Sequence, residues 1–123
     1  MSDDMVRAAA QRLKRRTARR EEEREARRRR AQSTARRIAT ILAEADPTLR
    51  RVIGFGSTFE TWRTFREDSD IDLGIEGGDW FLLSRSIPSS EFEVSLVELE
   101  LQNQEFSHHV RSHGETLYEK YHR

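Results

Sequence analysis

Two short stretches decide the fold of this chain, GFGS at residues 54–57 and SDIDL at residues 69–73. The first is a tight glycine turn after a short apolar run, and the second alternates two aspartates with apolar residues. On a β-strand, side chains at positions i and i+2 point to the same face. The pattern therefore predicts that Asp70 and Asp72 aim two carboxylates at one place while their apolar neighbours point into a core.

Paired carboxylates on one strand form a hard-oxygen site that suits Mg²⁺, which commonly reaches proteins together with substrate phosphates. A Gly-Ser turn nearby can offer backbone N–H groups and a hydroxyl to those phosphates. We expect Gly56 and Ser57 to hold a nucleoside triphosphate, with Ser57 at a helix N-terminus, and Asp70 and Asp72 to hold Mg²⁺. The plainer alternatives are a tight turn at the glycine and a strand end that merely faces water at the aspartates.

The Gly-Ser pair followed by Asp-x-Asp resembles the signature of the nucleotidyltransferase superfamily that includes polymerase beta. It is most similar to the minimal nucleotidyltransferases, many of which are paired with a HEPN-domain partner. The resemblance runs from about Thr34 to Tyr121 and includes HGETLY at residues 113–118, which matches the family's last helix. It implies a small α/β nucleotidyltransferase fold, in which a mixed sheet with flanking helices follows a long charged N-terminal helix.

The same resemblance implies an activity. A nucleoside monophosphate would pass from Mg²⁺·NTP to a hydroxyl of a protein or small molecule, with ATP as donor and AMP as the transferred group. A tyrosine of a HEPN-type toxin is an implied acceptor, and this chain would then be the antitoxin of the pair. Two other functions stay open. One is a catalytically degenerate member that acts as a binding partner, and the other is a nucleic-acid binder.

Members of this family usually have a third carboxylate beside the Asp-x-Asp pair, and this chain lacks it at the corresponding position. Where fully active members carry an aspartate on the next strand, this chain has Ser95, and serine has no pKa suited to a general base near neutral pH. Glu93 lies two residues earlier on the same predicted face, so we name it as a catalytic candidate beside Asp70 and Asp72. The alternative is that Glu93 is a solvent-facing charge on an edge strand.

Twelve residues separate Ser57 from Asp70, slightly more than is common in the family. Arg63 and Arg66 lie in this segment and are candidate triphosphate ligands, because guanidinium groups bind phosphate in a bidentate manner. Ordinary surface charge is the alternative for both. Three aromatic residues of the segment could stack on a base, although packing roles are expected for at least two of them.

The first third of the chain is predicted to be helical, because residues 5–45 contain no glycine or proline and are rich in Ala, Arg and Glu. Arginines interrupt any heptad seam, so residues 14–30 are interpreted as a solvated helix. We divide the chain into an Arg/Glu-rich extension, residues 1–31, and a nucleotidyltransferase domain, residues 32–123. The cluster Arg27–Arg30 resembles a nucleic-acid patch, but no aromatic residue is interleaved with it.

Charge is distributed unevenly along the chain. Residues 1–50 carry 15 basic and 8 acidic side chains, while residues 51–123 carry 7 and 14. This asymmetry indicates an electrostatic partner, or contact between the subunits of a homo-oligomer. The absence of cysteine excludes disulfides and thiolate metal sites. Because no apolar run approaches the length of a membrane helix, we expect a cytoplasmic protein without membrane contact.

The remaining pattern predicts strands at residues 51–55, 71–75 and 92–99. It predicts a helix that begins in residues 58–64, one helical turn at residues 79–84, and a closing helix over residues 102–121 that tolerates a glycine. His109 and His113 are spaced four apart on that closing helix. This is a spacing seen in zinc sites, but surface or packing roles are expected for both.

Overall fold

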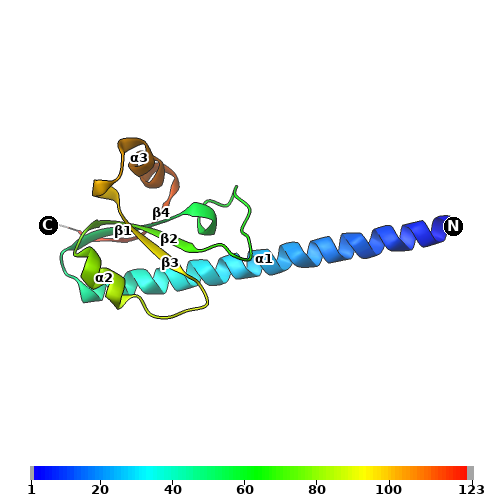
Figure 1. Cartoon of the computed structure of the whole chain (residues 1–123), viewed down its shortest axis with the longest axis horizontal. Coiled ribbons are helices and arrows are strands. Elements are labelled where there is room, and N and C mark those ends of the chain that lie inside the picture. Colours follow the sequence, from blue (N-terminus) through cyan, green and yellow to red (C-terminus); the bar gives the residue numbers. More distant parts are fainter. Residues whose placement is uncertain (1, 122–123) are drawn as a thin grey trace.

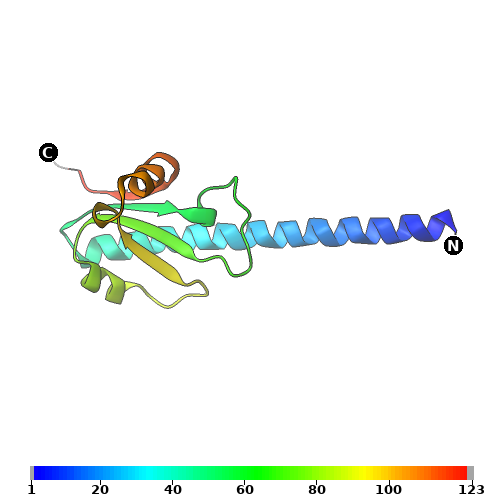
Figure 2. The same cartoon turned by 45° about the horizontal axis from the view of Figure 1, so that its top comes forward.

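The structure is a computed structural model that describes residues 2–121. Four strands form one sheet in the order β3-β2-β1-β4, and a long helix runs along the sheet and far beyond it (Figures 1 and 2). The elements are α1 (Asp3–Ala45), β1 (Leu49–Phe55), η1 (Gly56–Thr58), β2 (Ile71–Gly77), α2 (Trp80–Ser86), β3 (Val94–Glu98), η2 (Leu99–Leu101), α3 (Gln104–His113) and β4 (Glu115–Glu119). The mixed α/β fold with flanking helices behind a long charged helix is therefore confirmed.

The sheet is mixed. β1 pairs antiparallel with both β2 and β4, while β2 pairs parallel with β3. The register places Phe55 opposite Asp72 and Asp72 opposite Ser95. Paired residues of neighbouring strands lie on the same face of a sheet, so these three side chains form a row across the sheet.

Both faces of the sheet are covered. On one face, apolar residues of the strands pack against α1 and α2; the buried members of this cluster are Ala31, Ala35, Ile38, Ala39, Leu42, Leu49, Val52, Phe65, Ile71, Leu73, Ile75, Leu83, Phe92 and Leu96. On the other face, α3 and η2 bury Ile53, Phe55, Leu99 and Val110. The apolar residues that alternate with the two aspartates therefore point toward α1, and Asp72 points to the opposite face, as the sequence predicts.

Helix α1 is packed only over its second half. It begins after Ser2, whose hydroxyl accepts from the Met5 N–H, and it ends at Ala45 because Pro47 disfavours a helical residue before it. The first buried residue along α1 is Arg28, and the helix before it projects into solvent (Figures 1 and 2). Among residues 2–121, no helix is long and apolar enough to span a membrane.

The helix predicted to begin in residues 58–64 is wrong. The chain forms only the three-residue turn η1 there and then runs without regular structure to β2. Threonine and aromatic residues, which have low helix propensity, fill this segment. The Thr61 and Arg63 carbonyls accept hydrogen bonds from the Arg28 guanidinium instead of from a following helical turn.

The closing helix predicted over residues 102–121 is also wrong in its second half. Helix α3 ends at His113, and residues 115–119 form strand β4 against β1. At Gly114 the backbone passes so close to β1 that a Cβ would lie 2.6 Å from Ile53 Cγ2 and 2.8 Å from the Gly54 carbonyl oxygen. The glycine is therefore a crossing point between α3 and the sheet, and the segment that resembles the family's last helix is divided between helix and strand.

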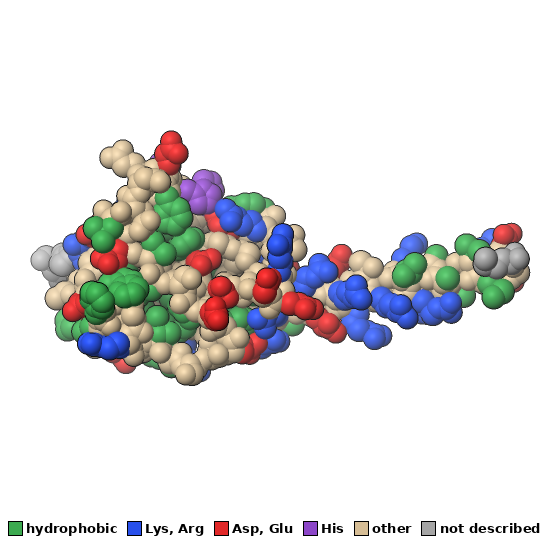
Figure 3. Space-filling model, viewed as in Figure 1, with side chains coloured by type: hydrophobic (Ala, Val, Ile, Leu, Met, Phe, Trp, Pro, Cys, Tyr) green, Lys and Arg blue, Asp and Glu red, His purple; other side chains and the backbone are tan. Residues whose placement is uncertain are grey.

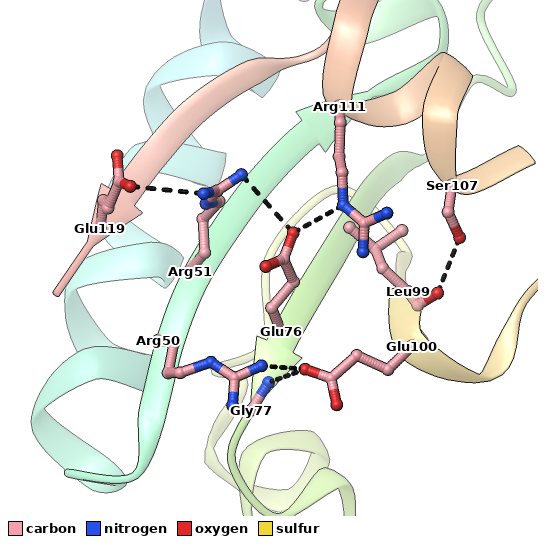
Figure 4. Close-up of polar contacts among 9 residues, drawn as sticks. All are labelled: Arg50, Arg51, Glu76, Gly77, Leu99, Glu100, Ser107, Arg111 and Glu119. Atoms are coloured by element: carbon pink, nitrogen blue, oxygen red, sulfur yellow. Dashed lines mark hydrogen bonds and ion pairs between the residues drawn. The ribbon is translucent and has the colours of Figure 1, made fainter. Parts of the chain in front are cut away.

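A network of ion pairs closes the end of the sheet at the C-terminus of β2 (Figure 4). The mostly buried Glu76 carboxylate accepts from Arg111 Nε at 2.9 Å and lies 3.6 Å from Arg51 Nη1, and Arg51 also reaches Glu119 at 3.4 Å. The Glu100 carboxylate pairs with Arg50 and accepts from the Gly77 N–H at 3.1 Å. The basic residues of β1 are thereby occupied at this end, and the two aspartates lie at the other end of β2.

Candidate nucleotide site

The two halves of the sequence motif meet in space. Gly56 has φ +71°, a conformation that residues with a side chain rarely adopt. A Cβ at this position would collide with Oδ2 of Asp72. Glycine is therefore required both for the turn and for the approach of the Asp72 carboxylate to the turn's backbone.

Two residues outside the motif hold the Gly-Ser turn. The Thr58 hydroxyl donates to the Asp70 carbonyl at 3.1 Å, and Gln32 Nε2 of α1 donates to the Thr58 carbonyl at 2.9 Å. The turn is thus fixed between α1 and the residues that enter β2. The sequence offered no signal for Gln32, because its partner lies 26 residues away. Ser57 follows Gly56 in a 3₁₀ turn of only three residues, so the helix N-terminus predicted for it is absent.

Asp70 and Asp72 lie together at the start of β2. Burial raises the pKa of Asp72 to about 6, and the neighbouring Asp70 carboxylate is the next largest cause; Arg63 opposes the shift and Glu60 adds to it. Three carboxylates thus concentrate negative charge at one place, with Arg63 as a cation close enough to offset it. A bound divalent cation would relieve this repulsion.

The donor set fits a metal that shares its ligands with a substrate. Among residues 2–121, no group of three or more His, Asp or Glu side chains is placed to hold a metal ion. Asp70 and Asp72 would supply only part of a coordination shell, and Mg²⁺ usually keeps waters and substrate phosphates as its other ligands. Asp70 and Asp72 remain the predicted metal ligands on this basis.

The two residues considered for the third carboxylate lie on and just before β3. Ser95 is exposed and pairs in register with Asp72. Glu93 is also exposed and precedes the strand; its carbonyl accepts from the Ile71 N–H at 2.9 Å, which extends the parallel pairing back toward Asp70. The backbone thus brings Glu93 next to the aspartate pair, while the side chain faces solvent. Its catalytic role stays a prediction.

Arg63 is held in place by two neighbours, and Arg66 is not. Arg63 Nε lies 3.3 Å from Oε2 of Glu60, and its carbonyl accepts from the buried Arg28 guanidinium. Arg66 is exposed, and only its backbone N–H is engaged nearby, donating to the Ser69 hydroxyl at 2.8 Å. The structure therefore favours Arg63 over Arg66 as a positioned phosphate ligand.

Glu60 is the main residue that the sequence did not single out. Its side chain is only 1% exposed, and its Oε1 lies 2.5 Å from His109 Nε2 on α3. Its Oε2 has no hydrogen-bond partner and faces Arg63. A buried carboxylate with an unsatisfied oxygen is costly unless it serves a charged neighbour, so Glu60 is a positioning residue for the Arg63 guanidinium.

The two histidines expected on the closing helix stack against each other on α3. The rings of His109 and His113 stack with centroids 4.6 Å apart, and His113 Nδ1 lies 3.3 Å from the His109 carbonyl oxygen.

Of the three aromatic residues in the loop between η1 and β2, Phe65 is buried and Phe59 packs under Gly54. Trp62 is 63% exposed, with its ring edge-on to His113, and it is the one aromatic of this loop left open to a ligand.

The arginine cluster at residues 27–30, which resembles a nucleic-acid patch, is largely engaged in contacts within the protein. Arg27 and Arg30 both pair with Glu91, at 3.5 Å and 3.2 Å. Arg28 is buried and binds the loop carbonyls already described. Three of the four arginines at positions 27–30 therefore hold the domain together.

No family model matches the chain, and no curated protein sequence matches it. Two solved structures share its fold. One is a mutant of the toxin-antitoxin MntA-HpeT, with 22% identity and a TM-score of 0.53; the other is a toxin-antitoxin with AMP-PNP, with 23% identity and a TM-score of 0.55. In each case the match covers 68% of this chain and 71% of the other. The likeness shows that this chain shares the fold of these two proteins.

Proposed function

We propose that this protein is a nucleotidyltransferase that moves a nucleoside monophosphate, AMP in the first instance, from Mg²⁺·NTP to a hydroxyl of an acceptor. The observation that carries the proposal is the contact between the two motif halves. The Asp72 carboxylate lies against Gly56, beside Asp70, in a position that only glycine permits. A purely structural turn beside a strand end needs neither a glycine with positive φ nor two carboxylates that repel each other.

The residues divide the work. The Gly56-Ser57 turn and Arg63 bind the triphosphate, and the Glu60 carboxylate holds Nε of Arg63 so that the terminal nitrogens stay available for phosphate oxygens. Asp70 and Asp72 hold Mg²⁺, which when bound neutralises phosphate charge as the α-phosphorus is attacked. The acceptor oxygen forms the new bond to the α-phosphorus, pyrophosphate leaves, and the hydroxyl proton passes to Glu93.

A partner protein is the proposed acceptor. The solved structures that share the fold are toxin-antitoxin proteins, one of them with a nucleotide analogue, and the sequence resembles a family paired with HEPN partners. We propose a hydroxyl of a HEPN-type toxin as the acceptor and this chain as the antitoxin. The test is to incubate the pair with ATP labelled at the α-phosphate, in which case the label should appear on the toxin and not on this chain.

A second candidate function is favoured by Ser95. An exposed serine, not a carboxylate, stands opposite Asp72 in the register. A chain that lacks a proton acceptor there would bind nucleotide and partner without turnover. Ser95→Asp separates the two candidates. If the protein is a catalytically degenerate binding partner, the wild type should be inactive and this variant should gain transfer activity. An active wild type would support the first proposal.

Calorimetric titration of Mg²⁺·ATP is the test that needs no acceptor. The wild type should bind only when Mg²⁺ is present. Asp70→Asn with Asp72→Asn should weaken binding at least about tenfold, a loss of about 1.4 kcal/mol. Glu67→Gln with Asp68→Asn is the matched control, because it removes two exposed carboxylates from the same loop. This control should bind at least as well as the wild type.

Each outcome has a defined meaning. Equal loss in both double variants would show that the Asp70 and Asp72 pair has no specific role in binding. Magnesium-independent binding would remove the metal from the proposal. No binding by a folded wild type would overturn the nucleotidyltransferase assignment and leave a role in partner binding.

A further inference from the structure

The projecting part of α1 carries a concentrated positive charge. We call residues 5–20 the arm; all of them are solvent-exposed except the partly buried Ala8. The arm contains seven basic side chains and no acidic one, namely Arg7, Arg12, Lys14, Arg15, Arg16, Arg19 and Arg20. Acidic residues flank it on both sides, at Asp3 and Asp4 and again at residues 21–23. The arm is therefore a bounded basic segment within a chain of zero net charge.

The arm differs from most of the basic residues near the sheet in how its charges are used. Closer to the sheet, arginines of α1, β1, the loop and α3 pair with acidic residues; those paired are Arg27, Arg28, Arg30, Arg36, Arg50, Arg51, Arg63 and Arg111. Within residues 2–121, no ion pair involves a side chain of the arm. Its seven charges are fully available to an external anion, as the blue side chains along the arm in Figure 3 illustrate.

Five of the seven charges share one face. The spacing of Arg12, Arg15, Arg16, Arg19 and Arg20 is i, i+3, i+4, i+7 and i+8, which is the spacing of a single stripe on an α-helix. The stripe is about 12 Å long at 1.5 Å per residue. A straight row of unpaired guanidinium groups with this spacing is complementary to a row of phosphates.

The composition of the arm favours nucleic acid over a protein partner. Protein interfaces depend on buried aromatic and aliphatic anchors and are depleted of charge at their centre. The arm has no aromatic residue, and its large exposed apolar side chains are only Met5, Val6 and Leu13. The lack of aromatic residues also disfavours single strands, which are held by base stacking. Of these partners, a nucleic-acid duplex bound through its phosphate backbone best matches the composition of the arm.

We propose that the arm binds double-stranded DNA through its phosphate backbone, without reading base sequence. An α-helix is about 10–12 Å across and fits the major groove of B-form DNA, which is about 12 Å wide. The deep and narrow major groove of double-stranded RNA does not admit a helix with side chains. This inference is independent of the nucleotide site, which lies on the domain and not on the arm.

The test measures binding of the full chain to a fluorescent 20-base-pair DNA as salt is varied. If each of the five arginines displaces one counterion, the logarithm of the association constant should fall against the logarithm of salt with a slope of about −4.5. That slope corresponds to about a 500-fold loss of affinity between 50 and 200 mM salt. Replacing all five arginines by glutamine should abolish most of the slope and weaken binding at least about tenfold at low salt.

Two control variants make the test sharp. Replacing the same five arginines by lysine keeps the charge and should keep the slope, because a phosphate contact needs only a point charge. Val6→Ser with Leu13→Ser should leave DNA binding unchanged. All substituted residues are exposed, so folding, checked by circular dichroism, should not change.

Three results would overturn the proposal. Affinity that does not depend on salt would exclude backbone binding. Equal or tighter binding to duplex RNA would exclude the major-groove assignment. Binding to polyglutamate as tight as to DNA at the same salt, weakened by Val6→Ser with Leu13→Ser, would show that the arm docks on an acidic protein.

Discussion

Replacing Asp72 with asparagine should stabilise this protein near neutral pH while it removes the site. The carboxyl is half-buried beside Asp70, and its pKa rises from the ordinary 3.8 to about 6. Ionisation of this group is therefore harder in the folded protein than in the unfolded chain. Asparagine keeps the shape of the side chain and carries no charge, so it escapes this cost.

The magnitude follows from linkage. A pKa change from 3.8 to about 6 corresponds to about 3 kcal/mol at 1.36 kcal/mol per pKa unit. Solvent screens a half-buried carboxyl, so we expect about 1–2 kcal/mol of the penalty to be measurable. The penalty is absent below about pH 3, where both states hold the proton, and it grows as pH rises. It is complete above about pH 7, where both states are ionised.

The assay is urea unfolding of the wild type and Asp72→Asn between pH 4 and pH 8, followed by far-UV circular dichroism and tryptophan emission. The difference in free energy of unfolding should be only a few tenths of a kcal/mol at pH 4 and about 1–2 kcal/mol in favour of the variant at pH 7.5. Asp46 contributes in the opposite direction. Asp46 accepts a hydrogen bond from the Thr48 hydroxyl, and this bond lowers the pKa of the Asp46 carboxyl. The stabilisation that Asp46 contributes is therefore lost only as pH falls below the ordinary carboxyl range.

Asp68→Asn, an exposed position in the same loop, is the matched control and should show no pH-dependent difference. Two results would contradict this expectation: a variant that is less stable than the wild type at pH 7.5, or a stability difference that is constant with pH. The first result would mean that Asp72 makes favourable contacts in the unliganded protein, and the second that its pKa does not differ between the folded and unfolded states.

Three further substitutions test the packing that positions the site. Gly56→Ala should cost about 1–3 kcal/mol and abolish Mg²⁺·ATP binding, because its Cβ would collide with Asp72; chemical unfolding and calorimetry check this. Gly114→Ala should cost about 1–3 kcal/mol by pushing β4 away from Ile53, with faster amide exchange in β4 as the readout. Leu42→Ala, in the α1 face of the core, should cost about 2–5 kcal/mol in thermal or urea unfolding.

The sequence predicted the parts of the fold whose patterns are local. The alternation of aspartates with apolar residues around Asp72 predicted both the strand and the face on which each side chain lies. The short apolar run before Gly56 predicted a strand that ends in the glycine turn. The long helix was predictable because propensity alone determines a charged segment without glycine or proline. These features need no knowledge of distant partners.

The parts that failed depend on contacts made far along the chain. Arg28 captures the loop carbonyls 33 and 35 residues away, so the loop cannot continue as a helix. Gly114 was expected inside a helix, and only its approach to β1 shows that it ends one. Glu60 belongs to the site through His109, 49 residues further on, and nothing in the local sequence marks that pair.

The length of α1 has a consequence for how the protein moves in solution. A helix of 43 residues is about 65 Å long, whereas a compact chain of this size has a radius of gyration of about 14 Å. The molecule should therefore tumble anisotropically and scatter X-rays as an elongated particle. The projecting part of the helix reaches well beyond the domain, so it samples a wider shell of solvent than the domain does as the molecule rotates.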